Sequence, residues 1–389
     1  MPARFVPGLE LAGAYFSDVV QPLLDAGYPR LRYAAGLLGW GSDVLGYDTA
    51  RSTDHNWGPR LLVLLADAGP ADGAAGGGAA GERPGRRGAA GELAADIMAT
   101  LGRRLPAEYR GYPTVFADVT RPGQPPRHWV EVAGLCGWLT GQLGFDPTRP
   151  VTTADWLATP TQQLAEVTGG AVFHDGPGDL GRARDRLAWY PRDVWLYVLA
   201  CQWQRIAQEE AFPGRCAEVG DELGAAVVTA RLARDLMRLC LLMHRRYPPY
   251  SKWLGTAFAR LPGVAALPPL LTAAVTATSW ATRQQHLCQA YRAVAASHNG
   301  LGLTERLDPS TRPYFSRPFQ VIGAGRFAEA LRQAIRDPRV RRLSPAGAVD
   351  QFIDSTDALG DTRLLRAASA AVMDRGETRG EDNQIPPGG

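Results

Sequence analysis

Apolar residues in the first part of the chain change from helical spacing to short continuous runs. Between residues 8 and 27 they recur every three or four positions, which predicts a helix that ends before Pro29. Two apolar runs follow, Tyr33–Leu38 and Leu61–Leu65, and their length is typical of buried strands. Helical spacing returns over Glu92–Leu105. The pattern therefore predicts a helix, two strands and a second helix.

Two further strand-like segments precede a long helical region. They are Pro113–Val119 and His128–Val132, and in the second Trp129 and Glu131 alternate with valines. Helical spacing then predicts helices over Asp155–Thr168, Val194–Phe212, Glu218–Arg246, Pro269–Ala296 and Gly325–Arg336. We expect an α+β fold, with a mixed sheet and flanking helices over residues 1–150 and an all-α helical bundle over residues 151–372.

Two segments lack a hydrophobic pattern. Residues 67–91 consist almost entirely of Gly, Ala, Pro and charged residues, which predicts a disordered insertion at the surface. Residues 373–389 are polar and rich in Gly and Pro, which predicts a disordered tail. Neither segment is expected to contribute to a core.

Composition narrows the classes of protein. No stretch approaches the roughly 18 apolar residues of a membrane span, and the N-terminus lacks a signal-peptide core, so we expect a cytoplasmic protein without a membrane partner. A net charge of +3 is too small to indicate a nucleic-acid partner. The five cysteines show no metal-binding spacing, and Cys201, Cys240 and Cys288 fall in helical patterns, which predicts free, buried thiols.

The segment between the first two strands contains the strongest candidate chemistry. Gly41 and Ser42 follow the first strand and predict a tight turn onto a helix N-terminus, where backbone N–H groups suit a phosphate. Asp54 and Asn56 precede the second apolar run; if they belong to that strand, their side chains share one face. Oxygen ligands beside a phosphate cradle suit a magnesium-bound nucleoside triphosphate. The alternative is an Asx turn that only introduces the strand.

This layout resembles the nucleotidyltransferase superfamily, which includes DNA polymerase beta and the antibiotic nucleotidyltransferases. Its signature is Gly-Ser, a loop, and Asp-x-Asp or Asp-x-Glu on the following strand; here it reads Gly41, Ser42, Asp54 and Asn56. The resemblance implies that Gly41 and Ser42 hold phosphates and that Asp54 and Asn56 bind Mg²⁺. The neutral amide of Asn56 replaces the second carboxylate, which should weaken binding of a second metal ion.

The same superfamily takes a third carboxylate from a later strand of the sheet. Two residues of this chain qualify, Asp118 in VFADV and Glu131 in WVEVA. Glu131 lies in the cleaner alternation and a helix is expected after it, so we prefer Glu131 as catalytic residue and metal ligand. For either residue the alternative is a carboxylate on an exposed strand face.

A second resemblance concerns the helical half. The region 183–261, including RLAWYPRDVWLY and YPPYSKWLGTAF, is similar to a family of uncharacterised bacterial proteins that join a nucleotidyltransferase-like half to a helical half. The later pieces SHNGLGLTERLDP, SRPFQVI and DQFIDSTDAL fit the same pattern. The likeness therefore spans nearly the whole chain outside the insertion and the tail, and it does not indicate a substrate.

Antibiotic nucleotidyltransferases share this two-part plan and take a general base and phosphate-binding cations from the helical half. The resemblance implies Glu209 or Glu210 as the base, with Arg205, Arg215 and Lys252 on the triphosphate. For the glutamates the alternative is a solvated helix end with paired charges.

A separate group of charges lies on one stripe of the predicted helix Glu218–Arg246. Arg231, Arg234 and Arg238 lie within one turn of Asp235 on either side, and an ion pair of Asp235 with Arg231 or Arg238 is expected.

Together the motifs predict a magnesium-dependent nucleotidyltransferase. It would move a nucleoside monophosphate, AMP from ATP, onto a hydroxyl of a small-molecule acceptor. The alternative is a catalytically weak nucleotide-binding or regulatory protein that retains the fold, with Asn56 in place of a metal carboxylate.

Overall fold

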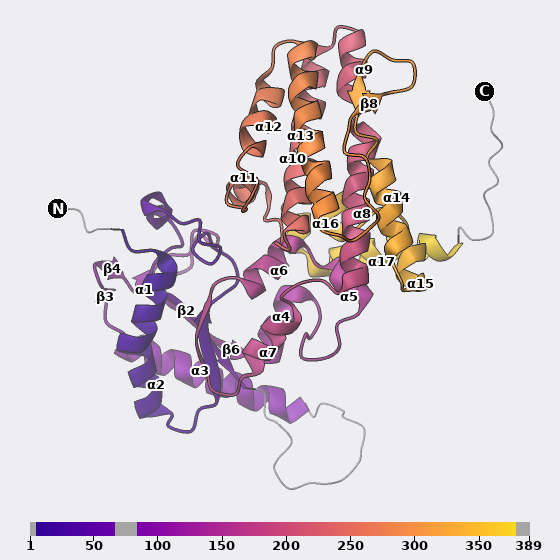
Figure 1. Cartoon of the computed structure of the whole chain (residues 1–389). Helices are drawn as coiled ribbons and strands as arrows, with labels where there is room; N and C mark the ends of the chain where they lie inside the picture. The colour runs from indigo at the N-terminus through magenta and orange to yellow at the C-terminus, as the bar shows by residue number, and fades with distance from the viewer. Residues whose placement is uncertain (1–4, 67–83, 379–389) are drawn as a thin grey trace. The chain divides into compact units, whose positions relative to one another are not determined.

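The computed structural model describes residues 5–66 and 84–378, and the fold is α+β as the sequence predicts (Figure 1). The chain divides into two compact units. Unit 1 comprises the residues up to Val151 together with Gln163–Ala188, and unit 2 comprises Thr152–Gln162 and the residues from Trp189 onward. The first segment of unit 1 ends next to the expected boundary at residue 150, but the chain then returns to unit 1 for a second segment.

Unit 1 is built on a five-stranded mixed sheet with the strand order β5-β6-β2-β1-β7. Its strands are β1 Tyr33–Leu37, β2 Arg60–Leu65, β5 Val115–Phe116, β6 Arg127–Gly134 and β7 Ala171–Asp175. Strands β2 and β6 run parallel and the other pairs run antiparallel. Strands β1 and β2 are buried at every position, as their continuous apolar runs predict.

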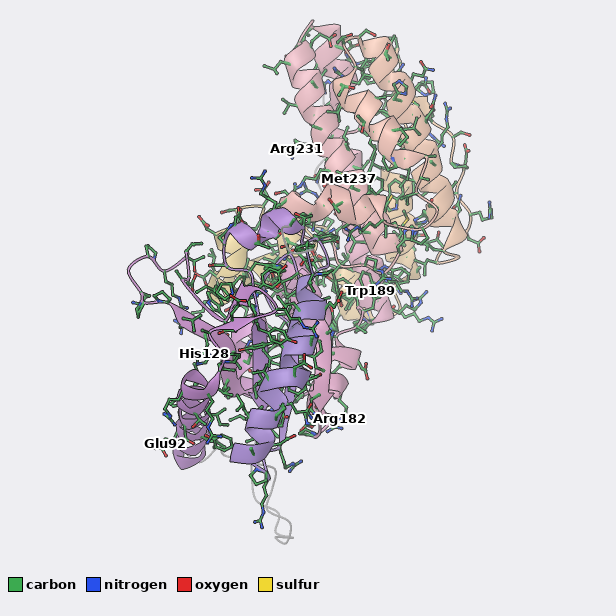
Figure 2. The ribbon with its side chains drawn as sticks, turned by 90° about the vertical axis from the view of Figure 1, so that its left-hand side faces the viewer. Glu92, His128, Arg182, Trp189, Arg231 and Met237 are labelled. Carbon is green, nitrogen blue, oxygen red and sulfur yellow. The ribbon has the colours of Figure 1, made fainter. Side chains whose placement is uncertain are left out.

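Helices cover one face of this sheet. The predicted first helix consists of α1 Gly8–Tyr15, a π-helical turn Phe16–Val20 and α2 Gln21–Gly27. Together with α3 Pro84–Arg104 these helices pack on alternate residues of the strands, such as Leu61 and Val63. His128 on β6, labelled in Figure 2, places Nε2 3.2 Å from the carbonyl oxygen of Met98 on α3.

Some of the remaining elements of unit 1 differ from what the sequence patterns predict. Helix α3 begins at Pro84, inside the stretch expected to be a disordered insertion, and residues 67–83 of that stretch lie outside the described residues. The two-residue strands β3 Glu108–Tyr109 and β4 Tyr112–Pro113 form a hairpin. Helix α4 Leu135–Leu143 follows β6, and α7 Asp179–Arg186 follows β7.

Unit 2 is mostly helical. Its longest helices, α8 Arg192–Glu209, α10 Glu222–Met243 and α13 Trp280–Gly300, lie side by side with α14 Gly325–Ala334 (Figure 1). The others are α5 Thr153–Ala158, α9 Phe212–Glu218, α11 Ser251–Ala259, α12 Leu267–Thr276, α15 Pro338–Arg342, α16 Val349–Phe352 and α17 Thr362–Thr378. A short hairpin of β8 Arg312–Pro313 and β9 Gln320–Val321 precedes α14.

Several predicted helices are interrupted. The helix expected over Asp155–Thr168 is split at Pro160 into α5 and α6 Thr161–Thr168, because proline disfavours helical geometry in the residue before it. The one expected over Pro269–Ala296 is split by an extended Ser279, whose hydroxyl accepts the backbone N–H of Thr282. Helix α17 extends into the expected tail as far as Thr378, and residues 379–389 lie outside the described residues.

Two further expectations can be compared with the structure. The five cysteines are free thiols, and Cys201, Cys240 and Cys288 are buried as predicted. None of the helices in the described part of the chain combines the length and apolarity needed to cross a bilayer.

Candidate functional site

A cavity of about 590 Å³ opens in unit 1 beside the sheet. Its wall is formed by the segment after β1, residues before and within β2, the loop before β6, strand β6 itself and helices α3 and α4. Cationic, aromatic and acidic side chains and one amide share this wall: Trp40, Asn56, Arg60, Asp118, Arg121, Arg127, Trp129, Glu131 and Trp138. The volume is in the usual range for small-molecule sites.

Strand register places four of these wall residues on one face of the sheet. Arg60 and Leu62 on β2 are opposite Trp129 and Glu131 on β6 in the parallel ladder. Because side chains two residues apart point to the same side of a strand, all four face the same way, and all four line the cavity. The alternation predicted around Glu131 is therefore present, with Glu131 exposed and Val130 and Val132 buried in the core.

A buried ion pair shapes the turn after β1. Arg60 Nη2 donates to Asp43 Oδ1 at 2.7 Å and Oδ2 at 2.9 Å, and the two side chains are only 6% and 2% exposed. Gly41 has a φ of +130°, and a Cβ there would lie 2.2 Å from Asp43 Oδ1 and 2.4 Å from Arg60 Nη2. Glycine is thus required at position 41 by the backbone and by the adjacent ion pair.

Aromatic rings form one side of the cavity. Trp40 is 46% exposed, Arg60 Cζ lies 4.2 Å from the centroid of its ring, and the ring of Trp129 approaches it edge-on at 5.7 Å. Trp129 is stacked on Phe116 at 4.9 Å and donates from Nε1 to the Phe116 carbonyl oxygen. Trp129 is therefore held rigidly, whereas Trp40 presents ring surface to solvent.

Asn56 and Asp118 are joined at the rim of the cavity. Asn56 Nδ2 donates to Asp118 Oδ1 at 3.2 Å, and the backbone N–H of Val119 donates to Asn56 Oδ1 at 3.0 Å. Asp118 Oδ1 also accepts from the Thr120 hydroxyl at 2.6 Å, and this hydrogen bond is the main cause that holds the pKa of Asp118 below its usual value. The Asp118 carboxylate is therefore charged at neutral pH.

Asp54 and Ser42 lie elsewhere than expected from the strand pattern. Strand β2 begins only at Arg60; Asp54 ends a 3₁₀ turn, Ala50–Asp54, and Asn56 has a φ of +47°. The alternation argument that placed Asp54 and Asn56 on one strand face is therefore wrong. Asp54 is 56% exposed, pairs with His55 Nδ1 at 2.6 Å and does not line the cavity.

The turn after Gly41 is not the N-terminus of a helix. Ser42 opens a series of turns in which the N–H of Tyr47 donates to the Ser42 carbonyl oxygen at 2.7 Å. Neither Gly41 nor Ser42 contributes to the cavity wall. The helix-dipole argument for phosphate binding at this turn is therefore wrong.

The cavity wall can be tested as a magnesium site. Within the described residues no three His, Cys, Asp or Glu side chains are grouped as a metal site. The wall does present oxygen donors from Asn56, Asp118 and Glu131, which are the hard ligands that Mg²⁺ prefers. Since Mg²⁺ is commonly held by one or two carboxylates together with substrate phosphates, this set fits a metal ion that arrives with a phosphate ligand.

The two glutamates proposed as a base both lie in unit 2 and both have structural partners. Glu209 forms a bidentate pair with Arg231, at 2.6 and 3.0 Å. Glu210 accepts the backbone N–H groups of Ile322, Gly323 and Ala324, the three residues directly before α14, at 2.9–3.0 Å. Burial raises the pKa of Glu210 despite these hydrogen bonds.

The predicted phosphate-binding cations of unit 2 are dispersed. Arg205 on α8 lies 3.4 Å from Asp235 and donates to the Gln351 carbonyl oxygen. Arg215 is exposed on α9. Lys252 lies in the first turn of α11, and its Nζ is 5.1 Å from the ring centroid of Trp253.

Sequence reasoning missed the Asp43–Arg60 pair and the cationic wall residue Arg127. Asp43 directly follows the Gly-Ser turn and Arg60 opens the second strand. A charged residue at the start of a run that is otherwise buried is a signal for a partner nearby. Arg127 has no comparable signal, because an arginine at a strand end is ordinary.

Comparison with known proteins finds a family similar to part of the chain, and that family has no assigned function. A family model described as a domain of unknown function (DUF4037) matches residues 156–254, which is less than half of the chain and includes no residue of the cavity wall. No curated protein and no solved structure matches the chain. The chain is thus an α+β protein of two units that contains a region similar to this family.

Proposed function

We propose that unit 1 binds a nucleoside triphosphate with Mg²⁺ and that the protein transfers the nucleoside monophosphate, AMP from ATP, to a hydroxyl of a small molecule. The observation that carries this proposal is the composition of one cavity wall. Arg60 and Arg127, the exposed ring of Trp40, and the carboxylates of Asp118 and Glu131 all line a space of about 590 Å³. Phosphates, a base and a metal ion each have a suitable contact there.

The cations of the wall support phosphate binding. Arg127 is exposed, and its Cζ lies 5.1 Å from the Trp129 ring centroid. Its guanidinium forms no hydrogen bond to a described residue. Arg121 is 70% exposed and lies 3.9 Å from Asp118, too far for a strong pair. Both guanidinium groups are therefore available to anionic oxygens, for which their planar geometry is well suited.

Glu131 is the best-placed proton acceptor. Its carboxylate is exposed in the cavity wall, and no described residue donates to it. In the proposed reaction the acceptor hydroxyl loses its proton to Glu131 as its oxygen attacks the α-phosphorus. An O–P bond forms, the bond to pyrophosphate breaks, and pyrophosphate leaves.

The wall also contains ligands for the metal ion. Asn56 and Asp118 would hold Mg²⁺ on the phosphates, where it supplies charge neutralisation. Asp54 and Ser42 stay predictions as metal and phosphate ligands, since their turns lie outside the cavity wall. Glu209 and Glu210 are less suited to be the base than Glu131, because Arg231 and three backbone N–H groups occupy their carboxylates.

The alternative is a nucleotide-binding regulatory protein with little or no transfer activity. Asn56 favours it, because an amide offers no charge to a second metal ion and its oxygen already accepts the N–H of Val119. Binding of the nucleotide alone does not separate the two functions, whereas release of pyrophosphate does.

The test combines nucleotide binding with transfer from α-labelled ATP to a panel of hydroxylated acceptors. We expect saturable Mg²⁺–ATP binding and pyrophosphate release by the wild type. Glu131→Gln should retain binding within a few-fold but lower the transfer rate by about 100-fold or more, the usual contribution of a general base. Glu108→Gln, which changes an exposed strand residue outside the cavity wall, is the matched control.

The possible results distinguish the transferase from the regulatory protein or overturn both. Binding without transfer to any acceptor would support the regulatory protein. Full transfer activity in Glu131→Gln would remove Glu131 from the mechanism. Absence of Mg²⁺–ATP binding by the wild type would overturn both functions.

A further inference from the structure

A second, smaller cavity lies within unit 2 and is unrelated to the proposed transfer site. Its volume is about 40 Å³, which accommodates about three water molecules at the usual 10–15 Å³ each and so suits a group the size of a phosphate. The wall includes Arg234 and Arg238 from α10, Tyr250 and Ser251 at the start of α11, and Asp350. Most of this wall lies within the region similar to DUF4037.

Neighbouring arginines of α8 and α10 have close acidic partners. Arg205 lies 3.4 Å from Asp235, Arg231 lies 2.6 Å from Glu209, and Arg238 lies 2.9 Å from Asp350. The ion pair expected between Asp235 and Arg231 or Arg238 is therefore wrong, because the close partners of these residues come from other helices. Arg231 marks the solvent-facing part of α10 in Figure 2.

Arg234 on α10 has no comparably close acidic partner in the described part of the chain. Among the described residues Asp354 is its one acidic partner within 4 Å, at 3.9 Å and 78% exposed, and the guanidinium forms no hydrogen bond to a described residue. Burial, and then the charge of Arg238, lower the pKa of Arg234. A half-buried guanidinium in this state gains more from an anion than one that is already paired.

The first turn of α11 adds donors at the same cavity. Its N-cap residue, Tyr250, follows Pro248 and Pro249 and provides no side-chain cap. The backbone N–H groups of Ser251 and Lys252 have no acceptor among the described residues. These groups and the helix dipole favour an anion, and they act from a different helix than Arg234.

Asp350 indicates which anion fits. Its Oδ2 accepts from the Thr161 N–H at 3.2 Å and from Arg238 at 2.9 Å, whereas Oδ1 is buried and has no hydrogen-bond partner in the described part of the chain. The side chain is 5% exposed and lines the cavity. An oxyanion that carries a proton can donate to Asp350 while its other oxygens accept from Arg234, and sulfate at neutral pH cannot.

From these contacts we infer that the unit 2 cavity binds the phosphate group of a small ligand, as inorganic phosphate or a phosphomonoester. Arg234 and the first turn of α11 hold the anionic oxygens, Arg238 keeps Asp350 in place, and Asp350 accepts the proton of the ligand. When no ligand is bound, Asp354 is the acidic residue next to Arg234. Its carboxylate therefore competes with the phosphate for the Arg234 guanidinium.

The test is isothermal titration of the full chain with inorganic phosphate, glycerol 3-phosphate and sulfate. We expect saturable binding of phosphate or of the phosphomonoester, and at least about tenfold weaker binding of sulfate. Tighter binding of glycerol 3-phosphate than of phosphate would identify a phosphomonoester as the ligand, and the reverse would identify the free ion.

Matched variants locate the site. Arg234→Gln should weaken phosphate binding about tenfold or more, whereas Arg231→Gln on the same helix, which lies outside the wall of the unit 2 cavity, should change it less than about twofold. Asp354→Asn should tighten binding several-fold, and Asp357→Asn, which changes the charge equally three residues further on, should not.

Three results would overturn the inference. They are absence of saturable binding by the wild type, equal affinity for phosphate and sulfate, and unchanged affinity in Arg234→Gln. ATP binding in unit 1 is measured separately, so failure of this site leaves the proposed transfer function untouched.

Discussion

Asp43 and Arg60 show how a single pair of residues determines the wall of the unit 1 cavity. The guanidinium of Arg60 is fixed by both carboxylate oxygens of Asp43 and by the carbonyl oxygen of Trp40. It also lies over the ring of Trp40. The position of Trp40 at the cavity therefore depends on an ion pair that is almost completely buried.

Removing one charge of the Asp43–Arg60 pair should lower the stability of the fold. We expect Asp43→Asn to lower the free energy of unfolding by about 3–5 kcal/mol, because it leaves the Arg60 charge buried without a counter-charge. Urea unfolding followed by circular dichroism measures the change. The double variant Asp43→Leu with Arg60→Met should recover most of the loss; a loss as large as in the single variant would show that the two charges are not the cause.

Trp40 gives a residue-scale test of how a nucleotide would be recognised. If the base stacks on the exposed ring, Trp40→Leu should weaken ATP binding by about 1–3 kcal/mol and leave inorganic tripolyphosphate binding unchanged. Trp40→Phe should retain most of the affinity for ATP. Equal losses for both ligands in a titration would assign Trp40 to packing around Arg60.

At the scale of single elements, Glu210 illustrates a role that the sequence does not separate from catalysis. It is the C-cap residue of α8, and it follows a face of that helix on which Trp195, Val198 and Ile206 are all buried. A carboxylate that continues such a buried face must have a partner. Its partners are backbone N–H groups of the three residues directly before α14, more than a hundred residues later in the chain.

These three hydrogen bonds predict a loss of stability when Glu210 is removed. Glu210→Ala leaves three backbone N–H groups without their acceptor and should lower the free energy of unfolding by roughly 2–3 kcal/mol. Glu209→Ala only removes a partly exposed ion pair and should cost about 1 kcal/mol or less. Thermal and urea unfolding of both variants tests this order. A stable Glu210→Ala that lacks transfer activity would instead restore Glu210 as the base.

The elements that the sequence predicts well are those with a strong apolar period. Strands β1 and β2 and the long helices α8 and α10 lie where their patterns place them, whereas the helix expected over Pro269–Ala296 is divided into α12 and α13. Strand β7 was missed because its five residues lie between two helices and carry no alternation. The turn that holds Asp54 was misplaced because a polar sequence next to an apolar run does not show where the strand begins.

The candidate site was predicted less completely than the fold, for a physical reason. The resemblance to nucleotidyltransferases implied Asn56 and either Asp118 or Glu131 as ligands, and all three line one cavity. The sequence around the arginines of the same wall contains no motif. Arg60 lies beside Trp129 only because β2 and β6 pair in this register. Contacts of this kind depend on pairing between distant segments, which local patterns do not encode.

At the scale of the whole molecule, unit 1 is built from two separate segments of the chain. Residues up to Val151 supply four strands of the sheet, and Gln163–Ala188 supplies the edge strand β7. Ala34 and Gly36 of β1 pair with β7, and a Cβ at Gly36 would lie 2.5 Å from the Ala171 carbonyl oxygen. The return segment is therefore part of the unit 1 core.

This organisation predicts the behaviour of truncated chains. A fragment ending at Pro150 loses β7 and exposes the unpaired backbone of β1, and such an edge favours association between molecules. We expect this fragment to aggregate or to unfold without cooperativity. A fragment ending at Ala188 keeps β7 and α7 and should unfold cooperatively as a monomer. Size-exclusion chromatography and thermal unfolding compare the two, and equal behaviour would show that β7 does not contribute to the stability of the sheet.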